Sequence, residues 1–265
     1  RTDNTSPTLD LLVNPRRTTP DALAAALAHE GVATEPSSIA PLALTVLSGN
    51  PLRSRQLTDG HFSVQDIGSQ LLPLLLPEGG TLIDLAAAPG GKSLSALAHG
   101  RARRTVAVDR SWRRLGRVVE NAQRLGLPEV RPVVGDVGSL PLAPGRFDRV
   151  LLDAPCSGTG TLRKNPEIRY RVTPGAIERL ARAQEGALAA AAALLARGGF
   201  LLFSTCSLEA EENERVVARV LERVRDLEPA PIALKGLEAL VEGARLRLFP
   251  DARTDGFTAH LLRRR

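Results

Sequence analysis

The chain of 265 residues contains no methionine, only two cysteines, and few aromatic residues, which make up 3% of the sequence. Two cysteines are too few for a disulfide framework, so we expect a protein of a reducing, cytoplasmic compartment. The scarcity of aromatic residues argues against the base-stacking surfaces of general single-strand binders. Because the chain starts with Arg1 and lacks methionine, we expect a longer translated product with a further domain upstream.

Long hydrophobic runs and metal-binding patterns are also missing. Charge, glycine or proline interrupts the apolar stretches, which argues against a membrane-spanning helix or a signal peptide. The four histidines have no spacing suited to a metal ion, and we expect no metal to be bound; they are His29, His61, His99 and His260.

The charge of the chain is basic, at +6, with 35 Lys and Arg residues against 29 Asp and Glu residues. Basic proteins bind polyanions, so nucleic acid is the first partner to consider, although an arginine-rich composition can also reflect genome bias. The length suffices for one sizeable α/β domain and a small additional unit.

Residues 1–60 have the pattern of a separate small unit. We expect strands near 9–15 and 41–46, with a helix between them that begins at Thr19-Pro20. This βαβ-like piece is too short to bury a core alone, so it should pack on the larger domain.

Residues 61–265 alternate strands with helices, which indicates a doubly wound parallel sheet with right-handed crossovers. Leucines at 71–76 predict a buried helix before this sheet. The five strands that we predict are 81–85, 105–108, 130–134, 149–152 and 200–204, and the later elements are helices at 174–195 and 209–224 and a closing hairpin within 246–262.

An acidic residue ends or follows each of the first four strands: Asp84, Asp109, Asp136 and Asp153. The carboxyl ends of parallel strands meet at one edge, where ligands bind, so these acids point to one crevice. A turn of small residues at 86–91, with an acid about twenty residues later, is typical of a nucleoside site. Without a full GxGxxG it suits a ligand that lacks a pyrophosphate, and S-adenosylmethionine fits.

A phosphate-binding loop is the competing interpretation of the same turn. Gly91-Lys92-Ser93 is similar to the end of a P-loop, and 150–153 is similar to its magnesium-holding strand. Ala86, however, stands where that motif needs glycine, and Pro89 removes a backbone donor. The NTPase interpretation also leaves both cysteines unexplained.

Both cysteines follow a predicted core strand, Cys156 after 149–152 and Cys206 after 200–204. A cysteine there can simply be a small core residue. A thiolate that adds to carbon 6 of cytosine, however, makes carbon 5 nucleophilic enough to accept a methyl group. Such an adduct needs an acid near the ring N3, a role that Asp153 could fill.

Three motifs resemble those of the Sun (Fmu)-type RNA cytosine-5 methyltransferases, especially the bacterial enzymes that act on 16S ribosomal RNA. They are DLAAAPGGKS at 84–93, DAPCSGTGTLRKNPEIR at 153–169 and STCSLEAEEN at 204–213. The resemblance covers nearly the whole chain. It implies a Rossmann-like, S-adenosylmethionine-dependent methyltransferase fold at 61–265, with a mostly parallel seven-stranded sheet containing one antiparallel strand, and an RRM-like wing at 1–60.

The resemblance also implies roles for individual residues. Cys206 would be the nucleophile, Cys156 would assist release of the covalent product, Asp153 would contact the cytosine, and Lys92 would lie near the base or its phosphate. Cofactor contacts carry over to Ala86, Ala87, Ala88, Pro89, Gly90, Gly91, Lys92, Asp109, Asp136 and Asp153.

A basic segment after the first cysteine is a candidate RNA contact. We expect Arg163, Lys164, Arg169 and Arg171 to bind phosphates beside the flipped base, whereas Trp112 should pack internally. The prediction is thus an enzyme that forms 5-methylcytosine, with ribosomal RNA as its partner. The alternatives are a methyltransferase-fold scaffold for ribosome assembly and a DNA cytosine-5 methyltransferase that uses Cys156.

Overall fold

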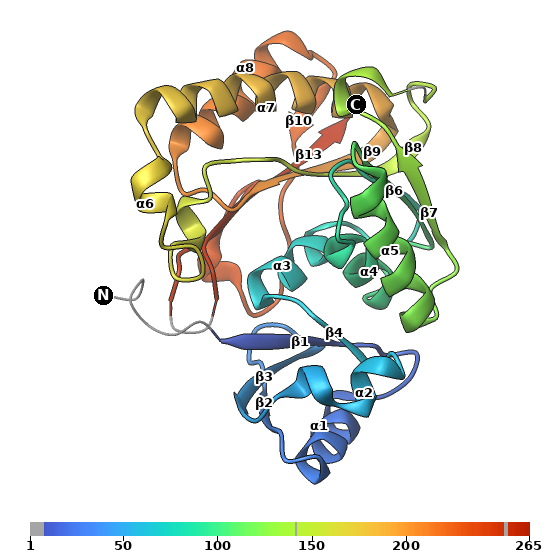
Figure 1. Cartoon of the computed structure of the whole chain (residues 1–265). Coiled ribbons are helices and arrows are strands. Elements are labelled where there is room, and N and C mark those ends of the chain that lie inside the picture. The colour runs from blue at the N-terminus through green and yellow to red at the C-terminus, as the bar shows by residue number, and fades with distance from the viewer. Residues whose placement is uncertain (1–7, 141, 252–253) are drawn as a thin grey trace.

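The computed structural model describes residues 8–140, 142–251 and 254–265, which form a small sheet beside a large one (Figure 1). All pairings in the small sheet are antiparallel, in the order β2-β3-β1-β4. Its strands are β1 (Leu9–Val13), β2 (Ala33–Pro36), β3 (Ala43–Ser48) and β4 (Phe62–Val64).

Helix α1 (Pro20–His29) packs on the small sheet and begins as the sequence predicts. The Thr19 side chain accepts a hydrogen bond from the Ala22 amide, and Pro20 occupies the first turn, where its missing N–H costs nothing. Strands β2 and β4 and the short helix α2 (Arg55–Thr58) are absent from the prediction. The seven buried residues of this core are Leu11, Val13, Leu23, Leu27, Val32, Leu44 and Phe62.

The small sheet is fixed to the end of helix α5 (Trp112–Leu125) by buried hydrogen bonds. Asn14 Nδ2 donates to the carbonyls of Gly60 (2.9 Å) and Leu125 (2.8 Å). A Cβ on Gly60 would lie 1.9 Å from the Arg124 carbonyl oxygen, so only glycine allows this approach. The division at residue 60 and the RRM-like character of 1–60 remain predictions.

The large sheet has a parallel centre and an antiparallel edge. The central order β7-β6-β5-β8-β9 is parallel, and β13 runs against β9. The strands are β5 (Thr81–Asp84), β6 (Arg104–Asp109), β7 (Val130–Val134), β8 (Phe147–Asp153), β9 (Leu195–Thr205), β10 (Leu227–Pro229), β11 (Val241–Glu242), β12 (Arg245–Leu248) and β13 (Phe257–Arg264).

This topology confirms the predicted Rossmann-like class. The seven strands from β12 to β7 include one, β13, that opposes its neighbours, as expected. Among the described residues the sheet has nine strands because the two short strands β10 and β11 extend its edge.

Helices cover both faces of the large sheet (Figure 1). Alternate residues of a strand point to opposite faces, so Leu82 and Leu151 join one buried cluster and Ile83 and Val150 join the other. The helices are α3 (Ile67–Leu71), α4 (Gly91–Ala98), α5, α6 (Ile168–Arg171), α7 (Pro174–Leu194) and α8 (Glu214–Arg223). None of these described helices could span a lipid bilayer.

Two predicted helices differ in extent from those observed. The expected helix at 71–76 is α3 followed by a 3₁₀ turn at Leu72–Leu75, where Pro73 interrupts the α-helical hydrogen bonds. The expected helix at 209–224 begins only at Glu214, after a 3₁₀ turn at Ala210–Glu212.

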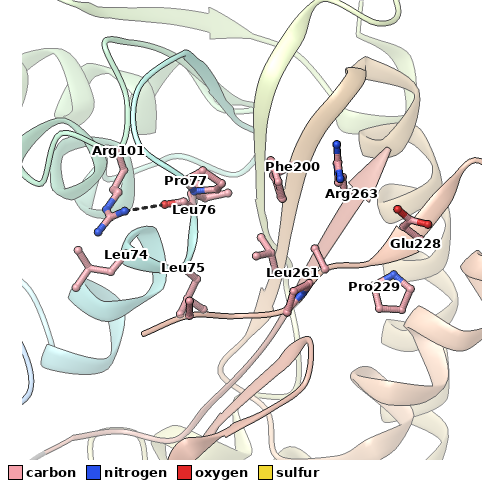
Figure 2. Close-up of a pocket in the computed structure, with 13 residues that line it drawn as sticks. Leu74, Leu75, Leu76, Pro77, Arg101, Phe200, Glu228, Pro229, Leu261 and Arg263 are labelled. Atoms are coloured by element: carbon pink, nitrogen blue, oxygen red, sulfur yellow. Dashed lines mark hydrogen bonds between the residues drawn. The ribbon is translucent and has the colours of Figure 1, made fainter. Parts of the chain in front are cut away.

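A cavity of about 380 Å³ lies between Leu74–Leu76 and strands β10 and β13 (Figure 2). Phe200 lines it in the amino-terminal half of β9, with the Arg263 guanidinium 5.8 Å from the ring centroid. None of its described lining residues is a predicted site residue, because those residues follow the carboxyl ends of the strands.

Candidate functional site

The carboxyl edge of the parallel strands brings the predicted chemical residues together. Strand β5 ends at Asp84, β6 at Asp109 and β8 at Asp153. Cys156 follows β8 and Cys206 directly follows β9, and these two strands are parallel neighbours with Asp153 opposite Ser204. Two residues fifty positions apart in the chain therefore share one end of the sheet.

The two thiols are in contact, with the Cys156 and Cys206 sulfurs 3.3 Å apart. Both cysteines are free, and each residue is partly exposed. The residues that follow them are also paired, since the hydroxyl oxygens of Ser157 and Ser207 lie 3.1 Å apart. The turns after β8 and β9 are thus joined side by side.

Gly160 allows these two turns to meet. Its amide donates to the Cys206 carbonyl (2.9 Å), and its own carbonyl accepts from the Gly256 amide (2.8 Å). A Cβ at this position would lie 2.3 Å from the Gly256 oxygen and 2.9 Å from the Cys206 oxygen. Glycine is therefore required here for close backbone approach rather than for an unusual φ angle.

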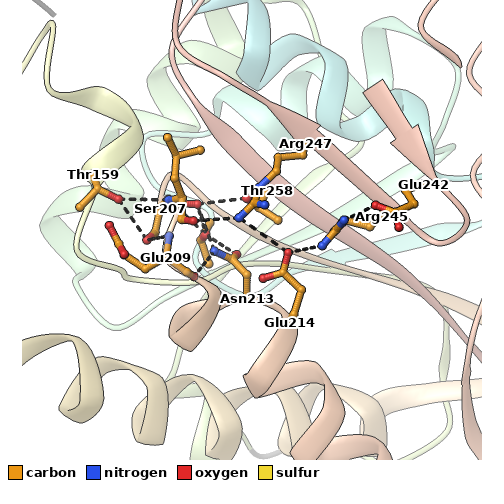
Figure 3. Close-up of polar contacts among 11 residues, drawn as sticks. Thr159, Ser207, Glu209, Asn213, Glu214, Glu242, Arg245, Arg247 and Thr258 are labelled. Carbon is orange, nitrogen blue, oxygen red and sulfur yellow. Dashed lines mark hydrogen bonds and ion pairs between the residues drawn. The ribbon is translucent and has the colours of Figure 1, made fainter. Parts of the chain in front are cut away.

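A buried polar network fixes the segment after Cys206 (Figure 3). Asn213 Nδ2 donates to the carbonyls of Ser207 (3.1 Å) and Glu209 (2.7 Å). The Thr258 hydroxyl donates to the same Ser207 carbonyl (3.1 Å) from β13. The carbonyls of this loop are thus satisfied inside the protein, and the backbone that carries Cys206 has little freedom to move.

Lys92 and Asp153 form an ion pair beside the thiols. Lys92, in the first turn of α4, places Nζ 2.7 Å from Asp153 Oδ2, and its side chain is only 17% exposed. The Ser204 hydroxyl donates to the other oxygen of Asp153 (2.8 Å). Burial disfavours the ammonium, but the charge and hydrogen bond of Asp153 outweigh it and raise the pKa of Lys92. Lys92 is therefore a fixed cation.

The thiols have opposite proton preferences. The hydrogen bond from Cys156 is the largest influence on Cys206 and lowers its pKa, with help from Lys92 and against burial. The same hydrogen bond is the largest of the influences that raise the pKa of Cys156. Burial is the second, and the nearby carboxylates act in the same direction. Both shifts favour ionisation of Cys206 over ionisation of Cys156.

Asp84 lies beneath this site and is fully buried. Burial raises its pKa to about 6, against the stabilising effects of a hydrogen bond from Ser93 and the charge of Lys92. The Ser93 hydroxyl donates to Asp84 at 2.6 Å, which ties the first turn of α4 to the end of β5. Asp84 therefore supports the turn rather than facing a ligand.

A cavity of about 270 Å³ lies next to the turn that carries Cys156, since Ala154 and Pro155 line it. Its volume is close to the low end of the range for small-molecule pockets. Ala86, Asp109 and Asp136 line it, as expected of cofactor-binding residues, together with apolar side chains such as Leu180 and Val137. Carboxylates can accept ribose hydroxyls, and apolar walls suit an adenine ring, so this set of residues fits a nucleoside.

The rest of the predicted cofactor turn lies elsewhere. Residues 87–91 do not line this cavity, and Lys92 and Asp153 contact each other on the thiol side. Arg114, which the sequence analysis did not identify, donates to both oxygens of Asp109 at 2.8 Å. Its position five residues after Asp109 on the following helix could have indicated it.

The predicted RNA contacts separate into two groups. Arg163 is a correction: its side chain is 1% exposed and lies 3.6 Å from Asp255, so a phosphate cannot reach it. Lys164 is 28% exposed and lies between two carboxylates, Asp66 (2.7 Å) and Asp255 (2.8 Å), which already neutralise its charge.

The basic residues of helix α6 differ from these. Arg169 and Arg171 are exposed on α6, where they flank Tyr170, a side chain that is 89% exposed. Trp112 is a further correction, since 71% of it is exposed at the start of α5 instead of packing internally. Within the described ranges, no three His, Cys, Asp or Glu side chains form a cluster that could hold a metal.

Sequence comparisons give one consistent result. A family model described as 16S rRNA methyltransferase RsmB/F matches residues 72–263. The ribosomal RNA small subunit methyltransferase B of Sodalis glossinidius is 39% identical over 247 residues, which cover 90% of this chain and 57% of the relative. The chain spans a little more than half the length of such relatives.

Structural comparisons agree with this result. The crystal structure of PH0851 is 30% identical, with a TM-score of 0.91, and the match covers 100% of this chain and 61% of that one. A methyltransferase homolog from Pyrococcus horikoshii is 26% identical, with a TM-score of 0.83 and coverage of 100% and 88%.

Proposed function

Because the chain belongs to the RsmB/F family of 16S rRNA methyltransferases, we propose that it methylates carbon 5 of a cytosine in 16S rRNA. S-adenosylmethionine is the donor in this proposal, and the protein acts in the cytoplasm, where ribosomal subunits are assembled. The observation that carries the proposal is the contact between two partly exposed thiols, 3.3 Å apart, at a sheet edge next to a fixed lysine.

Cys206 is the nucleophile in this proposal because its environment favours the thiolate. Its sulfur forms a bond to carbon 6 of the flipped cytosine, and the electron pair of the 5,6 double bond moves to carbon 5. Asp153, held by Lys92 and Ser204, contacts the ring and supports the adduct. Carbon 5 then uses that electron pair to form its bond to the methyl group, whose bond to the sulfonium sulfur of the donor would break and leave its electrons on that sulfur as S-adenosylhomocysteine.

Cys156 acts in the release step. Carbon 5 gives its proton to a solvent water, and the electrons of that bond form the 5,6 double bond again. The bond from carbon 6 to sulfur breaks, which returns an electron pair to Cys206. The Cys156 sulfur lies 3.3 Å from the Cys206 sulfur, close enough to assist this departure.

The cofactor contacts divide between two carboxylates and the small-residue turn. Asp109 would accept the ribose hydroxyls and Asp136 would contact the adenine, while Ala86 would let the ligand approach the backbone. S-adenosylmethionine, when bound, supplies an electrophilic methyl group. The unit at 1–60 and the exposed residues Arg169 and Arg171 are the proposed RNA contacts.

The test is methyl transfer to 16S rRNA, with the modified nucleoside identified by mass spectrometry. The wild-type chain should form 5-methylcytidine, and Cys206→Ala should form none. If Cys206→Ala stays fully active while Cys156→Ala is inactive, the roles of the thiols are wrong and the mechanism is that of the DNA enzymes. Binding of S-adenosylmethionine in calorimetry separates the enzyme from a scaffold, which need not retain the pocket.

A further inference from the structure

Glu212 is a charged residue with no exposed surface, six positions after Cys206. Its Oε1 accepts from the Ser157 amide (2.9 Å) and from Gln184 Nε2 (3.1 Å), and its Oε2 accepts from the Ser157 hydroxyl. All three donors are located at or next to the turn that carries Cys156. The carboxylate therefore contacts one catalytic turn while its own backbone belongs to the other.

Gln184 completes a clamp around Cys156. Its Nε2 donates to the Pro155 carbonyl (2.8 Å) as well as to Glu212 (3.1 Å). Pro155 precedes Cys156 and Ser157 follows it, so the two side chains hold the backbone on both sides of the thiol. Gln184 also lines the cofactor cavity, on helix α7.

A buried carboxylate is costly unless its surroundings compensate for lost hydration. Three hydrogen bonds compensate for it here, and an apolar residue would leave the Ser157 amide, the Ser157 hydroxyl and Gln184 without their acceptor. The carboxylate thus satisfies these donors and also places a negative charge beside the turn that carries Cys156. The charge lies on the Cys156 side of the thiol pair, whereas the cation Lys92 acts on Cys206. The two fixed charges thus act in the same direction on the proton shared by the two thiols.

We propose that Glu212 is a positioning residue that keeps the shared proton on Cys156 and leaves the negative charge on Cys206. The assignment of Cys206 as nucleophile rests on the proposed function, but the position of the proton can be measured without RNA. The other groups that face the thiols are Asp153, which opposes ionisation of both, and Lys92, which favours it at Cys206.

Glu212→Gln tests the charge, because glutamine keeps the shape and its oxygen can still accept from the Ser157 amide and Gln184. Its amide nitrogen would donate to the Ser157 hydroxyl in place of accepting from it. The chain is treated with limiting iodoacetamide over a range of pH, and labelling of each cysteine is measured by peptide mass spectrometry. Wild-type protein should label mainly at Cys206 near neutral pH. In Glu212→Gln the ratio of Cys206 to Cys156 labelling should fall severalfold, and the profile of Cys206 should move to higher pH.

Two further variants separate charge from structural support. Glu211→Gln is the matched control, since Glu211 is 40% exposed and pairs with Arg215 on the surface. It should label like the wild type. Glu212→Asp keeps the charge and should retain the preference for Cys206 even if it lowers stability. The proposal is overturned if Glu212→Gln labels like the wild type, or if Glu212→Asp and Glu212→Gln give the same ratio.

Methyl transfer provides the second measurement. Glu212→Gln should lower kcat severalfold and move the pH optimum upward, with little change in KM for RNA, because the charge on Cys206 and not RNA binding is altered. If the wild type labels as expected but forms no 5-methylcytidine, the proposed function fails and the assignment of Glu212 survives. If the wild type methylates and Glu212→Gln keeps the wild-type ratio, the assignment of Glu212 fails alone.

Discussion

Gly160→Ala tests whether the two catalytic turns depend on close backbone contact. The added Cβ would lie 2.3 Å from the Gly256 oxygen and 2.9 Å from the Cys206 oxygen, both backbone atoms with no rotamer to change. The turn at Thr159–Thr161 must therefore move away from the Cys206 loop. That movement stretches the two hydrogen bonds in which Gly160 takes part, at 2.9 and 2.8 Å.

The expected loss of unfolding free energy in Gly160→Ala follows from these contacts. Each stretched hydrogen bond is worth about 1 kcal/mol, and overpacking a buried site adds roughly 1–3 kcal/mol. The lower entropy of unfolded alanine offsets about 0.4–1 kcal/mol of this loss. We expect a net loss of about 3 kcal/mol, which leaves a domain of ordinary stability folded but weakened.

Urea unfolding at one pH measures this loss, with Gly186→Ala as the control. Gly186 lies within α7, and nothing is within 4 Å of the Cβ position. Alanine there should stabilise the chain by about 1 kcal/mol through its higher helix propensity. A Gly160→Ala variant as stable as the wild type would refute the idea that contact between the turns sets the thiol geometry.

Three other substitutions give separate tests. Asp109→Ala should weaken S-adenosylmethionine binding about tenfold or more, because a charged acceptor is worth about 1.5–3 kcal/mol; unchanged affinity in calorimetry would contradict the ribose role. Lys92→Met should raise the pKa of Cys206, so its alkylation should need higher pH, and an identical pH profile would disprove the influence of the ammonium. Burial lowers the pKa of His260 to about 4, whereas the unfolded chain takes up the proton near 6.5. The stability from neutral His260 is present above pH 6.5 and is lost as the pH falls to about 4, a change of about 3 kcal/mol. His260→Gln lacks this pH-dependent contribution, so the difference in unfolding free energy between wild type and variant should change between pH 7.5 and 4.5. A difference that stays constant over this range would contradict the lowered pKa of His260.

The sequence predicted the features that depend on local pattern. Apolar runs that end at an acidic residue identified β5, β6 and β8, since central parallel strands are buried on both faces. Because the carboxyl ends of parallel strands share one edge, the position of Cys156 and Cys206 just after two predicted strands placed both residues at that edge. The structure shows their sulfurs in contact at 3.3 Å.

The features that were missed depend on contacts between distant residues. Arg163 has the composition of an RNA-binding loop, but Asp255, more than ninety residues later, draws it into the interior. Strand β2 pairs only at the edge of the small sheet and carries little apolar pattern. The clamp formed by Glu212 and Gln184 is invisible for the same reason, because it joins α7 to two separate turns.

The most direct measurement is to identify the cysteine that bonds to RNA. Cys156→Ala is incubated with 16S rRNA and S-adenosylmethionine, denatured and digested, and the peptide joined to the nucleotide is sequenced by mass spectrometry. The account predicts that a methylated cytosine is attached to Cys206. It predicts no adduct in the double variant that carries Cys206→Ala together with Cys156→Ala. An adduct on any other residue, or complete turnover by Cys156→Ala with no trapped RNA, would contradict it.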